Sequence, residues 1–423
     1  MMAAEGPFLA AIIARLADPK FNLAAWGVAF AFAVLVEAPV IMIMSASTAL
    51  ARDATSFRRL RTFTYVLNAV VTGVMLVVLI PAVFHAIMVD AIALPQEVAD
   101  LTYVALWILL PWPGAIGYRR FYQGLLIRDG RTRRVAYGTI VRLTTMALTA
   151  LVLYVTLAPP GAYVGAAALA AGVSAEAIVS RLMARDTVRS LCATTPDPSD
   201  GALGYRMIVR FYYPLALTSL IGLAVQPMLT FFMGRAPAPV ESLAVFPVVA
   251  SLSFIFRAMG LSYQEVVIAL MGKHYDEVRA LGRFALGLGL ASSVGLALVA
   301  LTPLAGIWFG AISGLAPDLA RFAIVPTIVL IPIPFLSVIL SFQRGILVVA
   351  HETRPITWAT AIEVIGIVIG FPILGWKLGM VGVTAATLAF LVGRSAGIVY
   401  LLRPSVRVVR RQATERTPGG MWE

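Results

Sequence analysis

Charged side chains interrupt the long apolar runs of this sequence, where a buried charge is costly and usually has a function. The basic ones are Arg119, Arg120, Arg142, Arg181, Arg257, Arg344 and Arg394. The acidic ones are Glu37, Glu176 and Glu363, with Glu5 and Glu265 as further candidates. A guanidinium group binds carboxylates and phosphates through a planar fork of N–H donors. The excess of arginine therefore favours binding of an anion over binding of a cation.

The sequence offers little for covalent or metal chemistry. A single Cys192 allows no internal disulfide and no cysteine-based metal cluster, and His85, His274 and His351 are scattered along the chain. No Walker loop, nucleophile elbow or metal-ligand spacing is found. We therefore expect a protein that is not an enzyme, holds no metal and needs no cofactor.

The composition requires a membrane. Of 423 residues, 60% are hydrophobic and only 13% are charged, and the mean hydropathy is +0.90; globular proteins average roughly 25% charged residues. The net charge of +12 would suggest nucleic acid in a soluble protein. Here the basic residues lie mostly in short connections between apolar runs, so we expect a lipid bilayer and no nucleic acid as partner.

Apolar runs bounded by charges or by proline and glycine clusters predict an all-α polytopic membrane protein with about twelve transmembrane helices. They lie near 3 to 16, 23 to 50, 62 to 86, 98 to 127, 135 to 157, 161 to 184, 207 to 233, 243 to 271, 284 to 309, 319 to 350, 356 to 376 and 380 to 402. The first run is too short to cross a core of ~30 Å, which suggests that its helix is truncated at the N-terminus.

The connections alternate between arginine-rich and arginine-poor. The arginine-rich ones include 50 to 61, 128 to 134 and 185 to 210, together with the tail from 403 to 416. By the positive-inside rule these lie in the cytoplasm. We therefore expect a multi-pass protein of a bacterial inner (cytoplasmic) membrane, with its C-terminus in the cytoplasm.

An internal repeat relates the two halves of the chain at a constant offset. Pro111-Trp112-Pro113 aligns with Pro332-Ile333-Pro334, and Gly124 with Gly345. Six helices are an even number, so both copies enter the membrane from the same side and the repeat is parallel. The expected domains are an N-terminal six-helix lobe (1 to 186), a cytoplasmic linker (187 to 205), a C-terminal six-helix lobe (206 to 404) and a basic cytoplasmic tail (405 to 423).

The two repeated lobes, and the segment IIARLADP at 12 to 19 that ends the first helix, resemble the multidrug and toxic compound extrusion (MATE) family and the wider MOP flippase superfamily. The segments FYYPLAL at 211 to 217 and GMVGVTAATL at 379 to 388 look more like the progressive ankylosis (ANK) branch. The similarity covers nearly the whole chain, although its motifs are short and apolar.

This resemblance implies a secondary transporter that exports its substrate by alternating access, with Na⁺ or H⁺ as the coupling ion. MATE exporters often carry an acid in the first helix, and Glu5 is the nearest candidate here, about a turn from the expected place. The ANK branch is associated with export of small anions such as pyrophosphate, which agrees with the excess of arginine. The alternatives are a flippase for an anionic lipid-linked precursor and a cation-coupled multidrug exporter.

The helical rise places charged residues of each lobe at one depth, about 10 to 13 Å from the cytoplasmic helix ends. Arg142 and Glu363 occupy equivalent positions of the repeat with opposite charge. Such a layer is either an ion-pair network that ties three helices together or a polar vestibule open to the cytoplasm. The residues of the two layers are Arg119, Arg120, Arg142 and Glu176 in the first lobe, and Arg344, Glu363 and Arg394 in the second.

Glu37 and Arg257 lie deeper, about 20 Å from the cytoplasmic ends of helices two and eight. They correspond in the repeat, and repeat symmetry would bring them near the middle of the membrane, where such transporters bind substrate. We expect a gating or ligand-binding role, the alternative being a charge paired within its own lobe. Prolines that remove backbone donors are hinge candidates; they are Pro39, Pro111, Pro113, Pro332 and Pro334.

Overall fold

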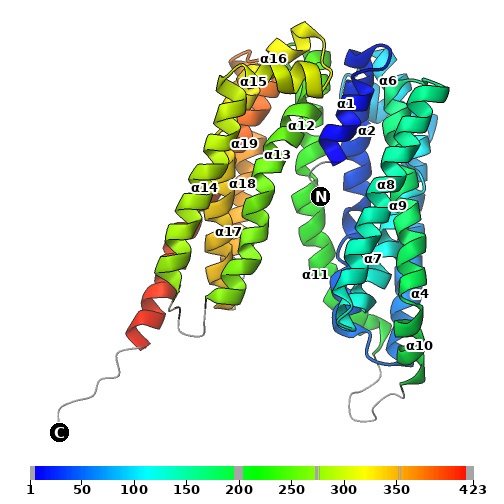
Figure 1. Ribbon diagram of the computed structural model, residues 1–423, viewed down its shortest axis with the longest axis vertical. Helices are drawn as coiled ribbons and strands as arrows, with labels where there is room; N and C mark the ends of the chain where they lie inside the picture. Colours follow the sequence, from blue (N-terminus) through cyan, green and yellow to red (C-terminus); the bar gives the residue numbers. More distant parts are fainter. Residues whose placement is uncertain are drawn as a thin grey trace. The chain divides into compact units, whose positions relative to one another are not determined.

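The computed structural model describes residues 5–194, 203–271, 275, 277–350, 352 and 354–415. Within these ranges all regular secondary structure is helical, as predicted. The chain forms two compact units, Met1–Gly234 (unit 1) and Arg235–Glu423 (unit 2). Figure 1 colours unit 1 from blue to green and unit 2 from green to red.

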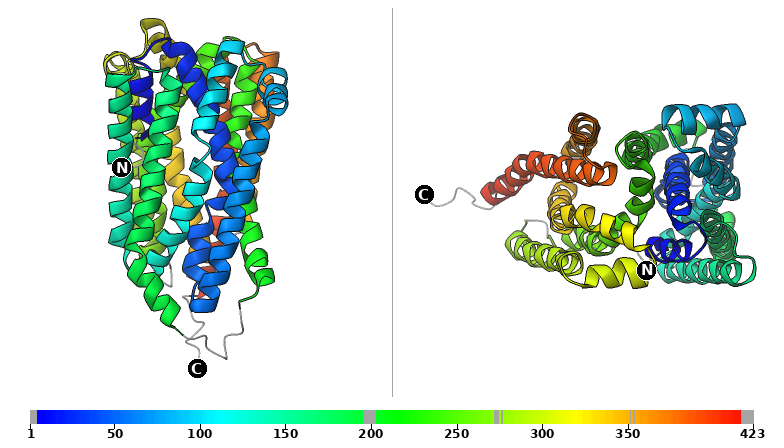
Figure 2. Two further views of the ribbon diagram at one scale, coloured as in Figure 1. Left: turned by 90° about the vertical axis from the view of Figure 1, so that its right-hand side faces the viewer. Right: turned by 90° about the horizontal axis from the view of Figure 1, so that it is seen from above.

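Most helices of unit 1 run lengthwise beside one another, as the two further views in Figure 2 show. The bounds in unit 1 are α1 (Glu5–Ile13), α2 (Pro19–Glu37), η2 (Ala38–Val40), α3 (Ile43–Leu50), α4 (Ala54–Val78), α5 (Pro81–His85), η3 (Ala86–Ala91), α6 (Gln96–Ile108), α7 (Trp112–Arg128), α8 (Thr132–Thr156), α9 (Gly161–Met183), α10 (Arg185–Ala193), α11 (Tyr205–Leu223) and α12 (Val225–Gly234). Those in unit 2 are α13 (Pro239–Leu270), α14 (Val278–Leu301), α15 (Leu304–Gly306), η5 (Ile307–Ile312), α16 (Pro317–Val329), α17 (Ile333–Val349), α18 (Arg354–Phe371), η6 (Pro372–Lys377) and α19 (Gly382–Glu415).

Eleven helical segments of the described chain are long and apolar enough to cross a membrane. Together with the short α1, of only nine residues, they match the twelve predicted helices. The prediction of a multi-pass, all-helical membrane protein is confirmed. The segments are Pro19–Leu50, Ala54–Val78, Gln96–Arg128, Thr132–Thr156, Gly161–Met183, Tyr205–Gly234, Pro239–Ile268, Val278–Leu301, Pro317–Val349, Arg354–Lys377 and Gly382–Arg411.

The third helix begins earlier than predicted. Asp53 caps α4: its Oδ1 accepts hydrogen bonds from the backbone N–H groups of Thr55 (2.7 Å) and Ser56 (3.0 Å), and Ser56 Oγ accepts one from the N–H of Asp53 (2.9 Å). This capping box satisfies donors that the first turn leaves free. The predicted start at 62 was wrong because the arginines between 58 and 61 were assigned to a loop.

Backbone conformation supports the internal repeat independently of side chains. The π-helical segments η3 and η5 occupy equivalent positions of the two units. Residues with positive φ, which cost a non-glycine residue energy, also recur at equivalent positions. The pairs are Asp18 (47°) with Ala238 (51°), Ala93 (64°) with Gly314 (72°), and Ala158 (41°) with Gly379 (66°).

Both Pro-x-Pro motifs break a helix at equivalent points. Pro111 separates α6 from α7, and Pro332 separates α16 from α17; each is the residue before the first turn of the second helix. Across each break the backbone makes tight turns, with the N–H of Trp112 bonded to Leu109 O and that of Ile333 bonded to Leu330 O, both at 2.9 Å. Whether these breaks act as hinges during function stays a prediction.

The compact units do not coincide with the two lobes expected from the repeat. Helices α11 and α12, which the repeat assigns to the second lobe, pack in unit 1 against η2 and α2. The Tyr212 hydroxyl on α11 donates a hydrogen bond to the carbonyl oxygen of Pro39. Helix α10 (Arg185–Ala193) runs from the end of the expected first lobe into the expected linker (187 to 205), of which 195–202 lie outside the described residues. The lobe boundaries stay a prediction.

Candidate functional site

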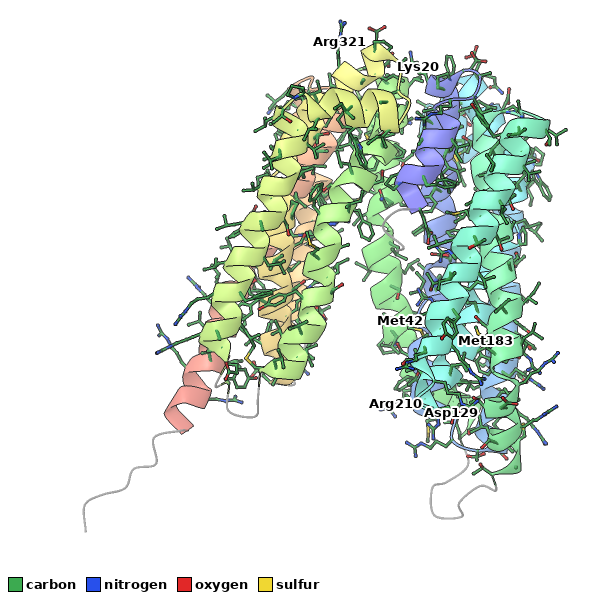
Figure 3. The ribbon with its side chains drawn as sticks, in the orientation of Figure 1. Lys20, Met42, Asp129, Met183, Arg210 and Arg321 are labelled. Carbon is green, nitrogen blue, oxygen red and sulfur yellow. The ribbon has the colours of Figure 1, made fainter. Side chains whose placement is uncertain are left out.

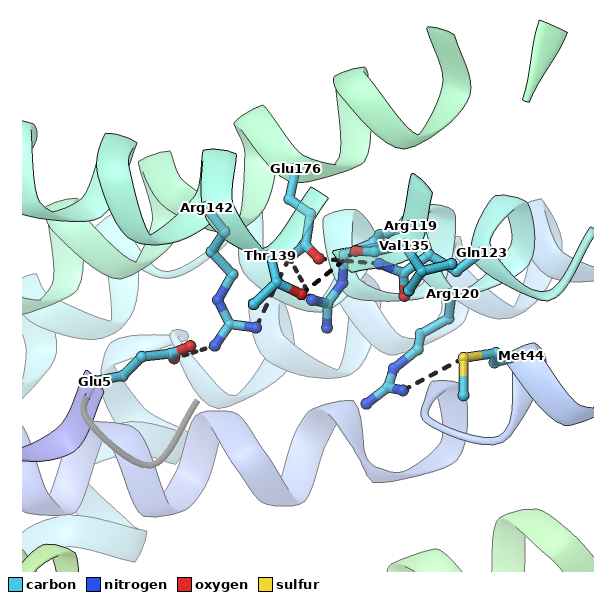
Figure 4. A network of polar contacts seen from close by, with 9 residues as sticks. All are labelled: Glu5, Met44, Arg119, Arg120, Gln123, Val135, Thr139, Arg142 and Glu176. Carbon is cyan, nitrogen blue, oxygen red and sulfur yellow. Dashed lines mark hydrogen bonds and ion pairs between the residues drawn. The ribbon is translucent and has the colours of Figure 1, made fainter. Parts of the chain in front are cut away.

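A buried ion-pair network in unit 1 is centred on Glu176 of α9. Its side chain is fully buried and accepts hydrogen bonds from Arg119 Nη1 and from Gln123 Nε2 (2.9 Å) on α7. Arg142 Nη1 of α8 lies 3.8 Å from Glu176 Oε2. Figure 4 shows these side chains converging from three helices. Three of the four residues of the predicted layer, Arg119, Arg142 and Glu176, therefore meet in the structure.

Arg142 extends this network to the first helix. Its Nη2 pairs with Glu5 Oε2 of α1, and both side chains are largely buried. Helix α9 can approach α8 at this level because Gly172 has no side chain: a Cβ there would lie 2.9 Å from the backbone oxygen of Arg142. Glu5 is therefore an ion-pair partner of Arg142, and its role as a coupling acid stays a prediction.

These pairs include neither Arg120 nor Glu37. Arg120 on α7 reaches Met44 Sδ at 3.7 Å, and its Nε is buried without a hydrogen-bond partner in the described chain. Glu37 is 7% exposed, and its Oε2 likewise has no partner. Arg119, Arg120 and Arg142 lie within electrostatic range of Glu37, yet none forms an ion pair with it. Burial of an unpaired carboxylate is costly.

Glu37 lies where its helix changes conformation. It is the last residue of α2, and the chain continues as the 3₁₀ turn η2 and then as α3. Pro39 within this turn has no N–H to continue the α-helical hydrogen bonding, and its carbonyl instead accepts the bond from Tyr212. The hinge candidate Pro39 thus lies in a helix break, and a buried acid without an ion pair, Glu37, lies beside this break.

Unit 2 contains a smaller network. Arg394 of α19 donates to Glu363 Oε1 of α18 from Nε (2.9 Å) and Nη2 (2.7 Å), and its Nη1 lies 3.4 Å from Ser337 Oγ on α17. Arg344 Nη2 donates to Thr360 Oγ1 at 3.2 Å. The backbones of α18 and α19 meet closely here, since a Cβ at Gly393 would lie 2.6 Å from the carbonyl oxygen of Glu363.

Arg257 of α13 contacts aromatic rings. Its guanidinium carbon lies 5.4 Å from the centre of the Phe254 ring and 5.5 Å from that of Phe390. Arg394 lies over the same Phe390 ring, at 4.9 Å. No carboxylate pairs with Arg257 among the described residues of unit 2; the side chain of Glu265 lies outside them.

Sequence reasoning identified the charged residues but missed several of their neighbours. Gln123 lies one helical turn after Arg119, and Phe254 lies nearly one turn before Arg257, so helical spacing could have indicated both. The pairing of Glu5 with Arg142 spans distant parts of the chain and left no local signal. Within the described residues, no group of three or more His, Cys, Asp or Glu side chains could hold a metal ion.

These features define a multi-pass helical membrane protein built from an internal repeat, with broken helices and buried ion pairs in both units. The particular fold is that of the MATE transporters of the MOP superfamily. No family model and no curated protein matches the sequence. The assignment of the fold therefore rests on solved structures.

Three similar structures illustrate the match. A multidrug resistance MATE family transporter in an inward-facing conformation is 16% identical, with a TM-score of 0.79 over 98% of this chain and 96% of that one. The lipid II flippase MurJ, inward closed, is 15% identical, with a TM-score of 0.68 over 100% and 92%. An outward-facing MATE family transporter is 17% identical, with a TM-score of 0.62 over 96% and 95%. The expected resemblance to MATE and MOP proteins is confirmed at the level of fold, and the ANK branch stays a prediction.

Proposed function

We propose that this protein is an alternating-access exporter of a small anionic molecule and performs no chemistry on its substrate. The fold is shared with MATE transporters solved in both inward-facing and outward-facing conformations. The proposal of an anionic substrate is supported by the balance of positive and negative side chains in the buried networks. The buried network of unit 1 has three acids, Glu5, Glu37 and Glu176, beside Arg119, Arg120 and Arg142. The described network of unit 2 contains Arg257, Arg344 and Arg394 but only Glu363.

A flippase for an anionic lipid-linked precursor is the second candidate. Its support is the fold shared with MurJ, which covers the whole of this chain. The same excess of arginine would then meet a lipid phosphate rather than a free anion. The anion exporter and the flippase predict different substrates, so one transport assay can separate them. The same assay can separate both from a cation-coupled multidrug exporter.

Transport can be measured with protein reconstituted in proteoliposomes. We expect accumulation of radiolabelled pyrophosphate or citrate that depends on an imposed Na⁺ or H⁺ gradient and is absent from empty liposomes. The gradient that drives accumulation identifies the coupling ion. Transport of the cationic dye ethidium alone would reverse the proposed substrate charge, and flipping of an anionic lipid alone would favour the flippase.

The proposed orientation places the arginine-rich connections and the C-terminus in the cytoplasm of a bacterial cell. In unit 1, Asp129 and Arg210 lie at one end and Lys20 at the other (Figure 3). In a Cys192→Ala background, Arg133→Cys should resist an impermeant thiol reagent in intact cells, because residue 133 lies in the same arginine-rich connection (128 to 134) as Asp129. Lys20→Cys should react. The reverse labelling pattern would invert the orientation.

A further inference from the structure

The arrangement of two phenylalanines and two arginines in unit 2 has no counterpart among the paired charges of unit 1. Phe254 and Arg257 are separated by nearly one turn of α13, and Phe390 and Arg394 by one turn of α19. Residues at these spacings share a helix face. Each helix therefore presents an aromatic ring beside a guanidinium, and Phe390 contacts both guanidinium groups.

The contacts of the two arginines differ. Arg394 is held by Glu363 and Ser337, which fixes its orientation. Arg257 lies over the rings of Phe254 and Phe390, and such cation–π contacts do not use the N–H donors of the guanidinium in hydrogen bonds to oxygen. No hydrogen bond from those donors is found within the described part of unit 2. Arg257 has intermediate solvent exposure.

Arg257 also lies near the middle of the span Pro239–Ile268. A cation at this depth is stabilised by a partner or by a water-filled cavity. Glu363 is already paired with Arg394 by two hydrogen bonds. The described network therefore gives Arg257 no ion pair of its own, and an anionic ligand would supply one.

We propose that Arg257, which lies over the rings of Phe254 and Phe390 and near Arg394, is a binding site for a phosphate or carboxylate group. The group accepts paired hydrogen bonds from the edge of the Arg257 guanidinium, and Arg394 adds a second positive charge. The aromatic rings favour a ligand that carries apolar atoms next to its anionic group. This site rests on the proposed function, because it is the substrate site that an anion exporter needs, but its occupancy can be tested without transport.

The phosphate can come from a free organic anion or from a lipid headgroup. The test uses the purified full-length protein in detergent and two probes, phenyl phosphate and dioleoyl phosphatidate, each compared with sodium chloride at equal ionic strength. The measurement is the apparent affinity from the concentration-dependent rise in melting temperature. Stabilisation by phenyl phosphate identifies a free anion as ligand, and stabilisation by phosphatidate alone identifies a lipid.

Arg257→Gln should weaken the apparent affinity by at least about tenfold, since a hydrogen bond to a charged group contributes about 1.5 to 3 kcal/mol. Arg257→Lys should retain part of the affinity, because the charge remains without the planar fork, and Phe390→Leu should weaken binding through lost stacking. Arg181→Gln is the matched control: Arg181 lies 5.1 Å from the centre of the Tyr122 ring in unit 1. Its affinity should equal that of the unsubstituted protein.

Equal stabilisation of the unsubstituted protein and of correctly folded Arg257→Lys and Arg257→Gln would overturn the site, and so would no stabilisation by either probe. The transport assay separates this proposal from the proposed function. If binding of the probe requires Arg257 but no anion is transported, the binding site is supported and the proposed exporter function is contradicted. If Arg257→Gln transports the anion as fast as the unsubstituted protein, the proposed exporter function is supported and the binding site at Arg257 is contradicted.

Discussion

Glu176→Gln is expected to lower the apparent melting temperature of the purified protein by roughly 10 °C. Glu176 is fully buried, and its partner Arg119 is only 2% exposed. Removing one partner of a buried ion pair costs about 3 to 5 kcal/mol, because the other charge stays buried and unpaired. For a unit of this size about 1 kcal/mol corresponds to roughly 2 to 4 °C. Fluorescence-detected size-exclusion after heating measures the change.

Glu97→Gln provides the control for this substitution. Glu97 is exposed in the first turn of α6, so the same chemical change there should shift the melting temperature by less than about 2 °C. The double substitution Arg119→Met with Glu176→Met should recover part of the lost stability, since neither charge then remains without a partner. A melting temperature for Glu176→Gln within 2 °C of the unsubstituted protein would contradict the network as drawn.

The membrane spans were predictable from sequence because each requires a long apolar run, and the runs are separated by proline, glycine or charge. The start of α4 is an exception to this relation between apolar runs and helices. The start of α4 carries three arginines, so hydropathy excluded a turn that Asp53 and Ser56 cap. The break at Pro111 was predictable from the missing N–H groups of two prolines, and the repeat then predicted the same break at Pro332.

The candidate site was only partly predictable. Helical rise gives the depth of a charge, and it correctly placed Arg119, Arg142 and Glu176 in one layer. Depth does not give the direction of a side chain. Arg120, adjacent to Arg119, therefore belonged to the predicted layer but turns toward Met44 in the structure. Pairing also depends on contacts between distant segments, and a single sequence carries no signal for these.

Glu37→Gln is expected to change stability in the direction opposite to Glu176→Gln, although the chemical change is the same and both residues lie in unit 1. Glu37 has no ion pair, and its buried Oε2 has no hydrogen-bond partner in the described chain. Replacing an unpaired buried carboxylate by a neutral amide removes a desolvation cost. We expect a gain of about 1 kcal/mol, or a rise in melting temperature of roughly 2 to 4 °C.

The same substitution should reduce transport at least about tenfold in the proteoliposome assay. Glu37 lowers stability and lies beside the helix break at Pro39. Both properties are expected of a residue that gains and loses an interaction during a transport cycle. Glu37→Asp keeps the charge and should retain partial transport, which separates the role of the carboxylate from that of side-chain length. Transport by Glu37→Gln at the rate of the unsubstituted protein would return Glu37 to a purely structural role. A loss of stability as large as that of Glu176→Gln would show instead that Glu37 is held in an ion pair.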